Sequence, residues 1–244
     1  MLDDTQLHTV MPTLAEAKRA LYLPHLNAAM RASGVGGSML RTAAFIAQLA
    51  HESGELRWME EIWGPTAAQS RYEPPGDLAK RLGNTDAGDG KRFKGRGPIQ
   101  ITGRSNYEKY GKLLGRDLLA DPALAAAPEL AFAVAGLFWQ SNGLNELADA
   151  QDFVAITKRI NGGTNGLPDR QMYYERAKAA LAAGFVADLV PRTRSAGPAT
   201  PLTPLTRGYE AVVRSERALK GAATRAARSA AEEARARPKR RVKG

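Results

Sequence analysis

The chain has 244 residues, of which 43% are apolar and 25% are charged, as in a globular protein with one sizeable core. This composition excludes disordered and fibrous proteins, and no apolar run approaches the roughly 20 residues that cross a bilayer. Cysteine is absent and there are only three histidines, which excludes disulfides, thiol nucleophiles and cysteine zinc sites. We therefore expect no metal and no cofactor.

The net charge of +10 comes entirely from the C-terminal end of the chain. Residues 1–190 hold 21 basic and 21 acidic residues, whereas residues 191–244 hold 14 and 4. The high isoelectric point therefore says nothing about what the body of the chain binds.

A change of composition near Pro191 predicts three segments. Residues 1–190 form the folded body, residues 191–208 form a linker with four prolines, and residues 209–244 form a basic helical tail rich in Ala and Arg. Such a tail suits an anionic cell envelope, with a purely solubilising helix as the alternative. Tyr209 is its only aromatic residue, so base stacking is poorly supported and no obligate nucleic-acid partner is expected.

The body is predicted to be mostly helical, with glycines at the helix ends. Ser38 is a good N-cap, and Asp121 before Pro122 fits a cap followed by a first-turn proline. Between Leu56 and Thr102 the helical period is lost, and only short strands at 57–63 and 98–102 are expected. The predicted helices are 13–33 with an interruption at Pro24, 38–53, 104–114, 128–142, 152–161, and 168–183 ended by Gly184.

Glu52 lies at the C-terminal end of the predicted helix 38–53, beside apolar neighbours. Desolvation and the negative end of the helix dipole favour the protonated carboxyl that a general acid needs. A solvated last-turn residue is the alternative. His51 and Glu52 also begin a zinc-protease string, but position 55 is Glu55 where the second histidine would stand, so no metal site is predicted there.

Glu61 follows Glu52 by nine residues, which on one continuous helix would separate the two carboxylates by roughly 13 Å along the axis. They can share a groove only if the helix ends between them, and Gly54 offers that break. A separation of about 6.5 to 9.5 Å would then suit water attack on a glycoside. A surface charge is the alternative for Glu61.

The string from Phe93 to Thr102, FKGRGPIQIT, has two glycines around an arginine and then alternating apolar and polar residues. This pattern predicts a tight turn leading into a strand whose Gln100 and Thr102 share one face. The string lacks both common phosphate-loop patterns. It therefore favours a polar wall of a sugar or peptide groove, with a plain hairpin as the alternative.

Five ordered motifs together resemble glycoside hydrolase family 19, in particular its bacteriophage and prophage endolysin branch. They are AFIAQLAHESGEL, MEEI, GRGPIQIT followed by NY, INGG and PDR. The resemblance covers roughly residues 43–180 and implies a mainly α, lysozyme-like α+β fold. It implies two helical lobes, with a small strand and loop region lining the cleft between them.

The resemblance also implies roles for individual residues. Glu52 would be the general acid, Glu61 the general base that activates water, and Thr102 the hydroxyl that helps to hold that water, where many relatives have Ser. Trp63, Arg71 and Tyr72 are further candidate sugar contacts. The substrate-binding positions implied by the motifs are Gln100, Asn106, Tyr107, Asn161 and Arg170.

The implied activity is hydrolysis of β-1,4 bonds at N-acetylated aminosugars with inversion. We expect an endolysin acting on peptidoglycan for host cell lysis, with a chitinase as the enzymatic alternative and a non-catalytic wall- or anionic-polymer-binding protein as the alternative of another class. The N-terminal sequence lacks a secretion-signal pattern, so we expect synthesis in the cytoplasm, release to the wall through a holin, and a monomeric protein.

Overall fold

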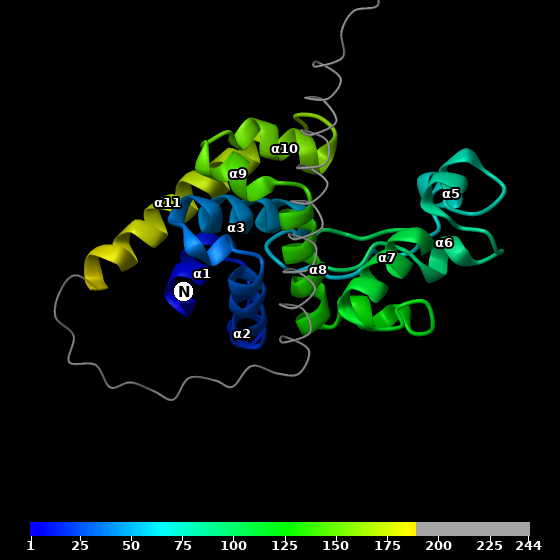
Figure 1. Cartoon of the computed structure of the whole chain (residues 1–244), viewed down its shortest axis with the longest axis horizontal. Coiled ribbons are helices and arrows are strands. Elements are labelled where there is room, and N and C mark those ends of the chain that lie inside the picture. The colour runs from blue at the N-terminus through cyan, green and yellow to red at the C-terminus, as the bar shows by residue number, and fades with distance from the viewer. Residues whose placement is uncertain (189–244) are drawn as a thin grey trace, which may run out of the picture.

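The structure of the protein, a computed structural model, describes residues 1–188 and the side chains of residues 1–183 (Figure 1). The predicted linker at 191–208 and the predicted helical tail at 209–244 lie outside the described residues. The helices are α1 (Asp4–Val10), α2 (Glu16–Ala32), α3 (Met39–Ser53), α4 (Ala67–Ser70), α5 (Asp77–Leu82), α6 (Asp89–Arg92), α7 (Arg104–Leu114), α8 (Pro128–Ser141), α9 (Leu144–Asp149), α10 (Phe153–Asn161) and α11 (Leu167–Asp188), with the 3-10 helices η1 (Val35–Gly37) and η2 (Pro122–Ala126).

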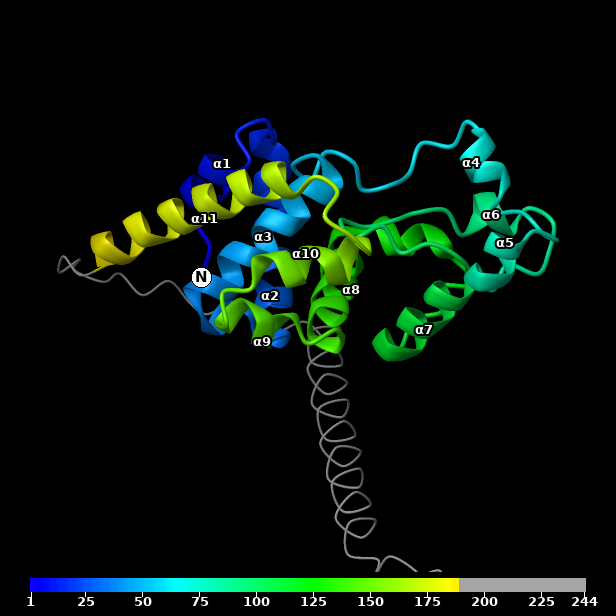
Figure 2. The same cartoon turned by 90° about the horizontal axis from the view of Figure 1, so that it is seen from above.

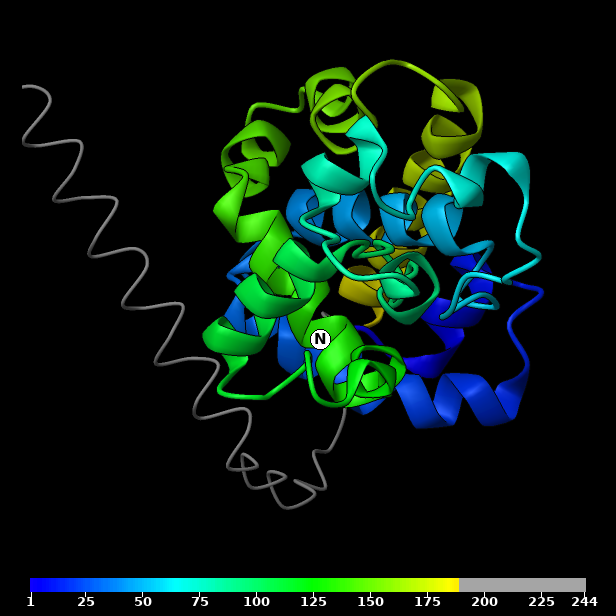
Figure 3. The same ribbon diagram turned by 90° about the vertical axis from the view of Figure 1, so that its right-hand side faces the viewer.

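The described residues form two hydrophobic cores that meet at α8. One face of α8 places Phe132 and Trp139 in the larger core, with α1, α2, α3, α9, α10 and α11. The other face places Val134 and Leu137 in a smaller core with α7. Figure 2 shows α4 to α7 gathered at one end of the molecule, away from α1, α2 and α11, and Figure 3 views the molecule from that end. The mainly helical, two-lobed fold expected from the resemblance is confirmed.

α3 is the central helix of the larger core. The Ser38 side chain accepts a hydrogen bond from the Leu40 backbone N–H at 3.2 Å, which caps the start of α3. Gly54 ends the helix with a φ of 56°, a left-handed conformation that glycine adopts without steric cost. Ten residues of α3 are buried, including Phe45, whose ring meets the Trp139 ring edge-on at 5.2 Å.

Three expectations about helices were wrong. α2 continues through Pro24, although proline cannot donate to the preceding turn. α11 runs past Gly184 to Asp188, because a glycine costs a helix only about 1 kcal/mol. The stretch after Leu56 contains the short helices α4, α5 and α6, whose few residues give too little hydrophobic periodicity to predict.

The two expected strand regions form only isolated bridges, and both bridges are to Arg96. Glu60 of the first region and Ile101 of the second each pair with it. The Gly97 N–H donates to the Met59 carbonyl at 2.9 Å, which continues this pairing. The segments 59–61, 95–97 and 100–102 therefore lie side by side at the base of the small lobe, which we define as residues 62–120.

A polar network holds the outer part of the small lobe together. Asp89 is 2% exposed, and its carboxylate accepts hydrogen bonds from the Thr85 and Asp86 backbone N–H groups and from the Arg104 guanidinium. Burial opposes ionisation of Asp89, but the bonds from Arg104 and the backbone outweigh it and lower its pKa. The Glu73 side chain accepts from the Gly88 and Lys91 N–H groups. These bonds replace the apolar packing that α4 to α6 largely lack.

Along the described part of the chain, none of the helices combines the length and apolar character needed to cross a membrane.

Candidate active site

Glu52 lies in the last turn of α3, with its side chain 24% exposed. Its Oε1 atom lies 2.6 Å from the Nη2 atom of Arg170, which comes from α11. Arg170 is 2% exposed, so the cation is buried on one side of a carboxylate that solvent reaches on the other. The structure therefore brings together two of the residues that the motifs single out.

Arg170 is itself fixed by a chain of buried polar groups. Its Nη1 atom donates to Oε1 of Gln48, and Nε2 of Gln48 donates to the Thr157 hydroxyl at 3.0 Å. Both Gln48 and Thr157 are 1% exposed or less. The position of the guanidinium against Glu52 is thus set by α3 and α10 as well as by α11.

Asn161 and Arg170 share a partner in the loop between α10 and α11. Nδ2 of Asn161 and Nε of Arg170 both donate to the Asn165 carbonyl, at 3.2 and 3.3 Å. Asn161 is half-buried, and its contact orders the INGG turn beside the Arg170 guanidinium. The substrate-binding role predicted for Asn161 stays a prediction.

The chain reverses between Glu52 and Glu61, as the sequence argument requires. Gly54, Glu55 and Leu56 have φ values of 56°, 61° and 58°, three consecutive left-handed residues of which two carry side chains. Glu55 is 7% exposed and stabilises this turn. Its carboxylate accepts from the Thr13 N–H and hydroxyl at 2.7 and 2.5 Å and from the Tyr173 hydroxyl at 2.9 Å.

Burial opposes ionisation of Glu55, but the hydrogen bonds from Thr13 and Tyr173 and the nearby Arg176 charge outweigh it and lower the pKa of Glu55. Burial and the bond to Glu55 raise the pKa of Tyr173 to about 12, so its hydroxyl stays a donor. Glu55 therefore acts as a buried structural carboxylate in the turn and is no metal ligand.

Glu61 lies where residues 59–61 pair with residues 95–97. Its backbone N–H donates to the Gly95 carbonyl at 2.8 Å, and its Oε2 atom accepts from the Gly95 N–H at 2.9 Å. Its Oε1 atom accepts from Nε2 of Gln69 in α4, also at 2.9 Å. Both carboxylate oxygens thus face neutral donors, in contrast to the cation beside Glu52.

Gln100 and Thr102 lie against the same Gly95. A Cβ atom on Gly95 would be 2.2 Å from Oε1 of Gln100 and 3.3 Å from Oγ1 of Thr102. The Thr102 hydroxyl donates to the Gln100 carbonyl at 3.1 Å, and Nδ2 of Asn106 donates to the Thr102 carbonyl at 2.8 Å. The structure therefore gathers Glu61, Gln100 and Thr102 around one glycine, with Asn106 bonded to the Thr102 backbone.

Tyr107 does not line a subsite in this structure, which corrects the role expected for it. Its side chain is 0% exposed. Its hydroxyl donates to the Lys94 carbonyl at 2.6 Å and accepts from Nη1 of Arg96 at 2.8 Å. Burial, opposed in part by Arg96, raises the pKa of Tyr107 to about 12. The side chain holds the 94–96 segment in place from beneath because it lies on the inward face of α7.

Aromatic side chains accompany the carboxylates. The rings of Trp63 and Tyr72 lie 6.2 Å apart, and burial together with the charge of Glu61 raises the pKa of Tyr72. Trp58 is 53% exposed and follows the reversal after Glu52. Aromatic rings are faces on which pyranose rings stack, and the sugar contacts predicted for Trp63 and Tyr72 stay predictions.

No cluster of metal-ligating side chains exists within residues 1–183. His51, which begins the HExx string, bonds Oδ2 of Asp169 through Nδ1 at 2.6 Å, and Gly166 packs against its ring.

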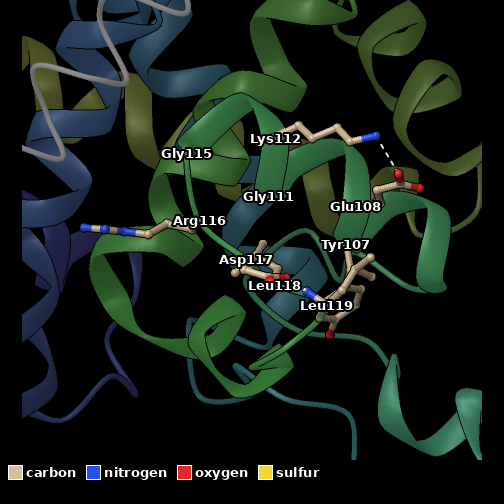
Figure 4. Close-up of a pocket in the computed structure, with 9 residues that line it drawn as sticks. All are labelled: Tyr107, Glu108, Gly111, Lys112, Gly115, Arg116, Asp117, Leu118 and Leu119. Carbon is tan, nitrogen blue, oxygen red and sulfur yellow. Dashed lines mark hydrogen bonds and ion pairs between the residues drawn. The ribbon is translucent and has the colours of Figure 1, made fainter.

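A pocket of about 340 Å³ lies away from these carboxylates, between α7 and the loop that follows it (Figure 4). Of the predicted site residues, only the buried Tyr107 contributes to it. Its Lys112 and Glu108 side chains pair with each other, and the Asp117 side chain caps the following turn. Figure 4 shows Arg116 pointing away from the other lining residues.

Sequence reasoning missed two side chains of the site, Gln48 and Gln69. Gln48 lies four residues before Glu52, the spacing that places two side chains on one helical face, and this could have revealed it. Gln69 follows Thr66 by three residues, the signature of a capping box, but no pattern showed that its amide reaches Glu61.

The sequence model of the family described as chitinase class I, glycoside hydrolase family 19, matches residues 27–166. A Haemophilus influenzae protein named as containing a glycosyl hydrolase family 19 domain is 36% identical over 159 residues, 55% of this chain and 77% of that protein. An Arabidopsis thaliana endochitinase is 43% identical over 122 residues, 50% of this chain but only 39% of the plant protein. The chain thus spans well under half of that plant relative.

Solved structures agree with this match. The class IV family 19 chitinase from Zea mays superposes with a TM-score of 0.58 at 26% identity, over 74% of this chain and 92% of that one. Chitinase C from Streptomyces griseus gives a TM-score of 0.58 at 22% identity, over 74% and 76%, which shows a shared fold.

Proposed function

The chain belongs to glycoside hydrolase family 19, and we propose that it hydrolyses the β-1,4 glycosidic bonds of bacterial peptidoglycan with inversion. The observation that carries this proposal is the pair of glutamates in different surroundings. Glu52 meets a buried cation and Glu61 meets two neutral donors, on either side of a chain reversal. The two carboxyl groups therefore stand in different surroundings, one beside a cation and one between two neutral donors.

In the proposed reaction, Glu52 donates its proton to the glycosidic oxygen as the bond from that oxygen to the anomeric carbon breaks. Arg170 is paired with Oε1 of Glu52, so Oε2 is the oxygen that carries the transferred proton. Glu61 takes a proton from a water molecule whose oxygen forms the new bond to the anomeric carbon. Each turnover consumes one water and leaves Glu52 ionised and Glu61 protonated, so both groups exchange protons with solvent before the next.

The surroundings of Glu61 support its role as base. Donors on both carboxylate oxygens fix the orientation of the carboxylate. The Thr102 hydroxyl donates a hydrogen bond to the Gln100 carbonyl, so its oxygen is left to accept from a water molecule near Gly95. Gln100, Asn106 and Asn161 remain proposed sugar-binding residues.

The substrate separates two enzymatic proposals. Peptidoglycan is supported by the similarity of the motifs to those of phage endolysins, and by a chain of 244 residues without cysteine, unlike the disulfide-bearing chitinases of the family. Chitin is supported by the names of the Arabidopsis and maize relatives. The same N-acetylated ring and β-1,4 bond occur in both polymers, so the carboxylates alone do not choose between them.

Host cell lysis, release to the wall through a holin, and contact of residues 191–244 with the anionic envelope belong to the same proposal. They are supported by the endolysin resemblance and by the 14 basic residues of that segment. A wall-binding protein without turnover is the alternative of another class.

The test is digestion of purified peptidoglycan and of chitin, in parallel, by the wild type and by Glu52→Gln. Released fragments and new reducing ends are identified by mass spectrometry. Muropeptides cut between sugars by the wild type alone support the peptidoglycan proposal. Chitin fragments alone would favour the chitinase alternative. If neither polymer is cleaved, the wall-binding protein without turnover becomes the favoured alternative.

A further inference from the structure

Gln69 is a buried amide with every hydrogen-bonding position occupied. It is 5% exposed. Its Oε1 atom accepts from the Gly64 and Thr66 N–H groups at 3.1 and 2.8 Å. Its Nε2 atom donates to Oε1 of Glu61 at 2.9 Å and to the Ile62 carbonyl at 2.8 Å. Two donors and two acceptors are all that a glutamine side chain offers.

The orientation of this amide follows from its partners. A flipped amide would set its NH2 group against two N–H donors and its oxygen against a carbonyl and a carboxylate. The Gln69 backbone N–H also donates to the Thr66 hydroxyl at 3.2 Å, which completes a capping box at the start of α4. The Nε2 donor is therefore held toward Glu61 from both ends of the side chain.

Glu61 has its second oxygen on the Gly95 N–H, so the two contacts together set the plane of the carboxylate. We propose that Gln69 is a positioning residue that orients the Glu61 carboxylate for the attack of water. This inference rests on the proposed function, in which Glu61 is the base. It makes α4 part of the catalytic machinery, although Gln69 itself touches no substrate.

Two tyrosines and an adjacent glutamate are ionisable neighbours of Glu61. Tyr72 and Tyr107 both feel its charge, but each has a raised pKa and stays neutral over the working range. The adjacent Glu60 is paired with Lys94 at 3.3 Å and with Arg96 at 2.9 Å. The amide of Gln69 is thus the side-chain donor in direct contact with the base.

The decisive variant is Gln69→Glu. One oxygen of the new carboxylate keeps the bonds from Gly64 and Thr66, and glutamate is as good as glutamine in a capping box. The other oxygen replaces the donor and lies about 2.9 Å from Oε1 of Glu61. Two carboxylates at that distance share one proton, which removes the base at neutral pH.

The experiment measures pH–rate profiles of the wild type, Gln69→Glu and Gln69→Leu on whichever polymer the wild type cleaves. We expect the acidic limb of Gln69→Glu to move up by at least about one pH unit, with kcat about tenfold or more lower at pH 7 and recovering as the pH rises. KM should change little. Gln69→Leu should lower kcat with a smaller shift of the limb.

Thr66→Ala is the matched control, because it removes the hydroxyl of the capping box and leaves the contact of Gln69 with Glu61. It should lower stability without moving the acidic limb. The positioning role would be overturned if the acidic limb of the pH–rate profile moves as far in Thr66→Ala as in Gln69→Glu. It would also be overturned if that limb stays in place in Gln69→Glu.

A second readout needs no activity. Carboxyl ¹³C resonances of labelled glutamate are followed through a pH titration, with Glu61 assigned by its loss in Glu61→Gln. Protonation of Glu61 at higher pH in Gln69→Glu than in the wild type supports the inference, and identical titrations overturn it. If the wild type cleaves no polymer, the proposed function fails, and this titration still decides whether Gln69 controls Glu61.

Discussion

The guanidinium of Arg170 lies 2.6 Å from the carboxylate of Glu52, and it comes from a helix more than a hundred residues later in the chain. The cation is buried, whereas the carboxylate is reached by solvent. Removal of one partner from a buried ion pair is costly, because it leaves the other charge uncompensated. The pair therefore couples the packing of α3 against α11 to the position of the proposed acid.

Arg170→Met should separate these two effects. Loss of the guanidinium removes the group that fixes the Glu52 carboxylate, so kcat should fall about tenfold or more. The free energy of unfolding should fall by about 2 to 4 kcal/mol, because Gln48 and Glu52 lose a buried partner. Urea denaturation and steady-state kinetics measure the two effects. An unchanged kcat in a folded variant would show that Arg170 does not act on the acid.

Gly95→Ala should damage activity more than stability. The new Cβ atom would lie 2.2 Å from the end of the flexible Gln100 side chain, which must then move away from the site. We expect the free energy of unfolding to change by less than about 1 kcal/mol and kcat to fall about tenfold or more. Gly37→Ala is the control, since nothing lies within 4 Å of its Cβ position. Equal activity of the two variants would contradict the tight arrangement around Gly95.

Glu55→Gln should make the protein less sensitive to acid. The pKa of Glu55 is below its ordinary value of 4.5, so its charge stabilises the fold above that value and the contribution is lost as pH falls through the lowered pKa. Denaturation at pH 7 should show a loss of about 1 to 2 kcal/mol relative to the wild type. The difference should shrink in titrations below about pH 4.5, and a difference that grows there would contradict the account.

Asp89→Asn should loosen the outer part of the small lobe. The substitution removes the negative charge that pairs with the Arg104 guanidinium. We expect faster proteolytic cleavage within residues 62–92 and a loss of about 2 to 4 kcal/mol in the unfolding of that part. Asp77→Asn is the matched control, because its pair with Lys80 is exposed and should contribute nothing measurable. Equal rates of cleavage in the two variants would show that the bonds to Asp89 do not stabilise this part of the small lobe.

The sequence predicted the long helices because their caps are local signals. Ser38, Gly54, Gly115 and Gly162 end or begin helices where the pattern indicates. The short helices within residues 67–92 escaped prediction because their order comes from side-chain bonds between distant segments, such as Glu73 with residues 88 and 91. Propensity and periodicity contain no information about such pairings.

The candidate site shows the same division. Motif spacing identified Glu52, Glu61 and Arg170, and the structure places the first and last in contact. Motif spacing did not identify Gln69, because an amide at a helix cap resembles any other capping residue until the fold brings Glu61 beside it. Tyr107 was assigned to the wrong environment, since its place in the motif says nothing about which face of α7 is buried.

Hydrolysis by two carboxylates with direct attack of water fixes the configuration of the first product. Proton NMR during the first minutes of digestion distinguishes the two anomers of a new reducing end before they interconvert. We predict the α-anomer from a β-1,4 bond, and its loss in both Glu52→Gln and Glu61→Gln. A β-anomer as the first product would mean retention through a covalent intermediate, which would contradict the roles given to Glu52 and Glu61.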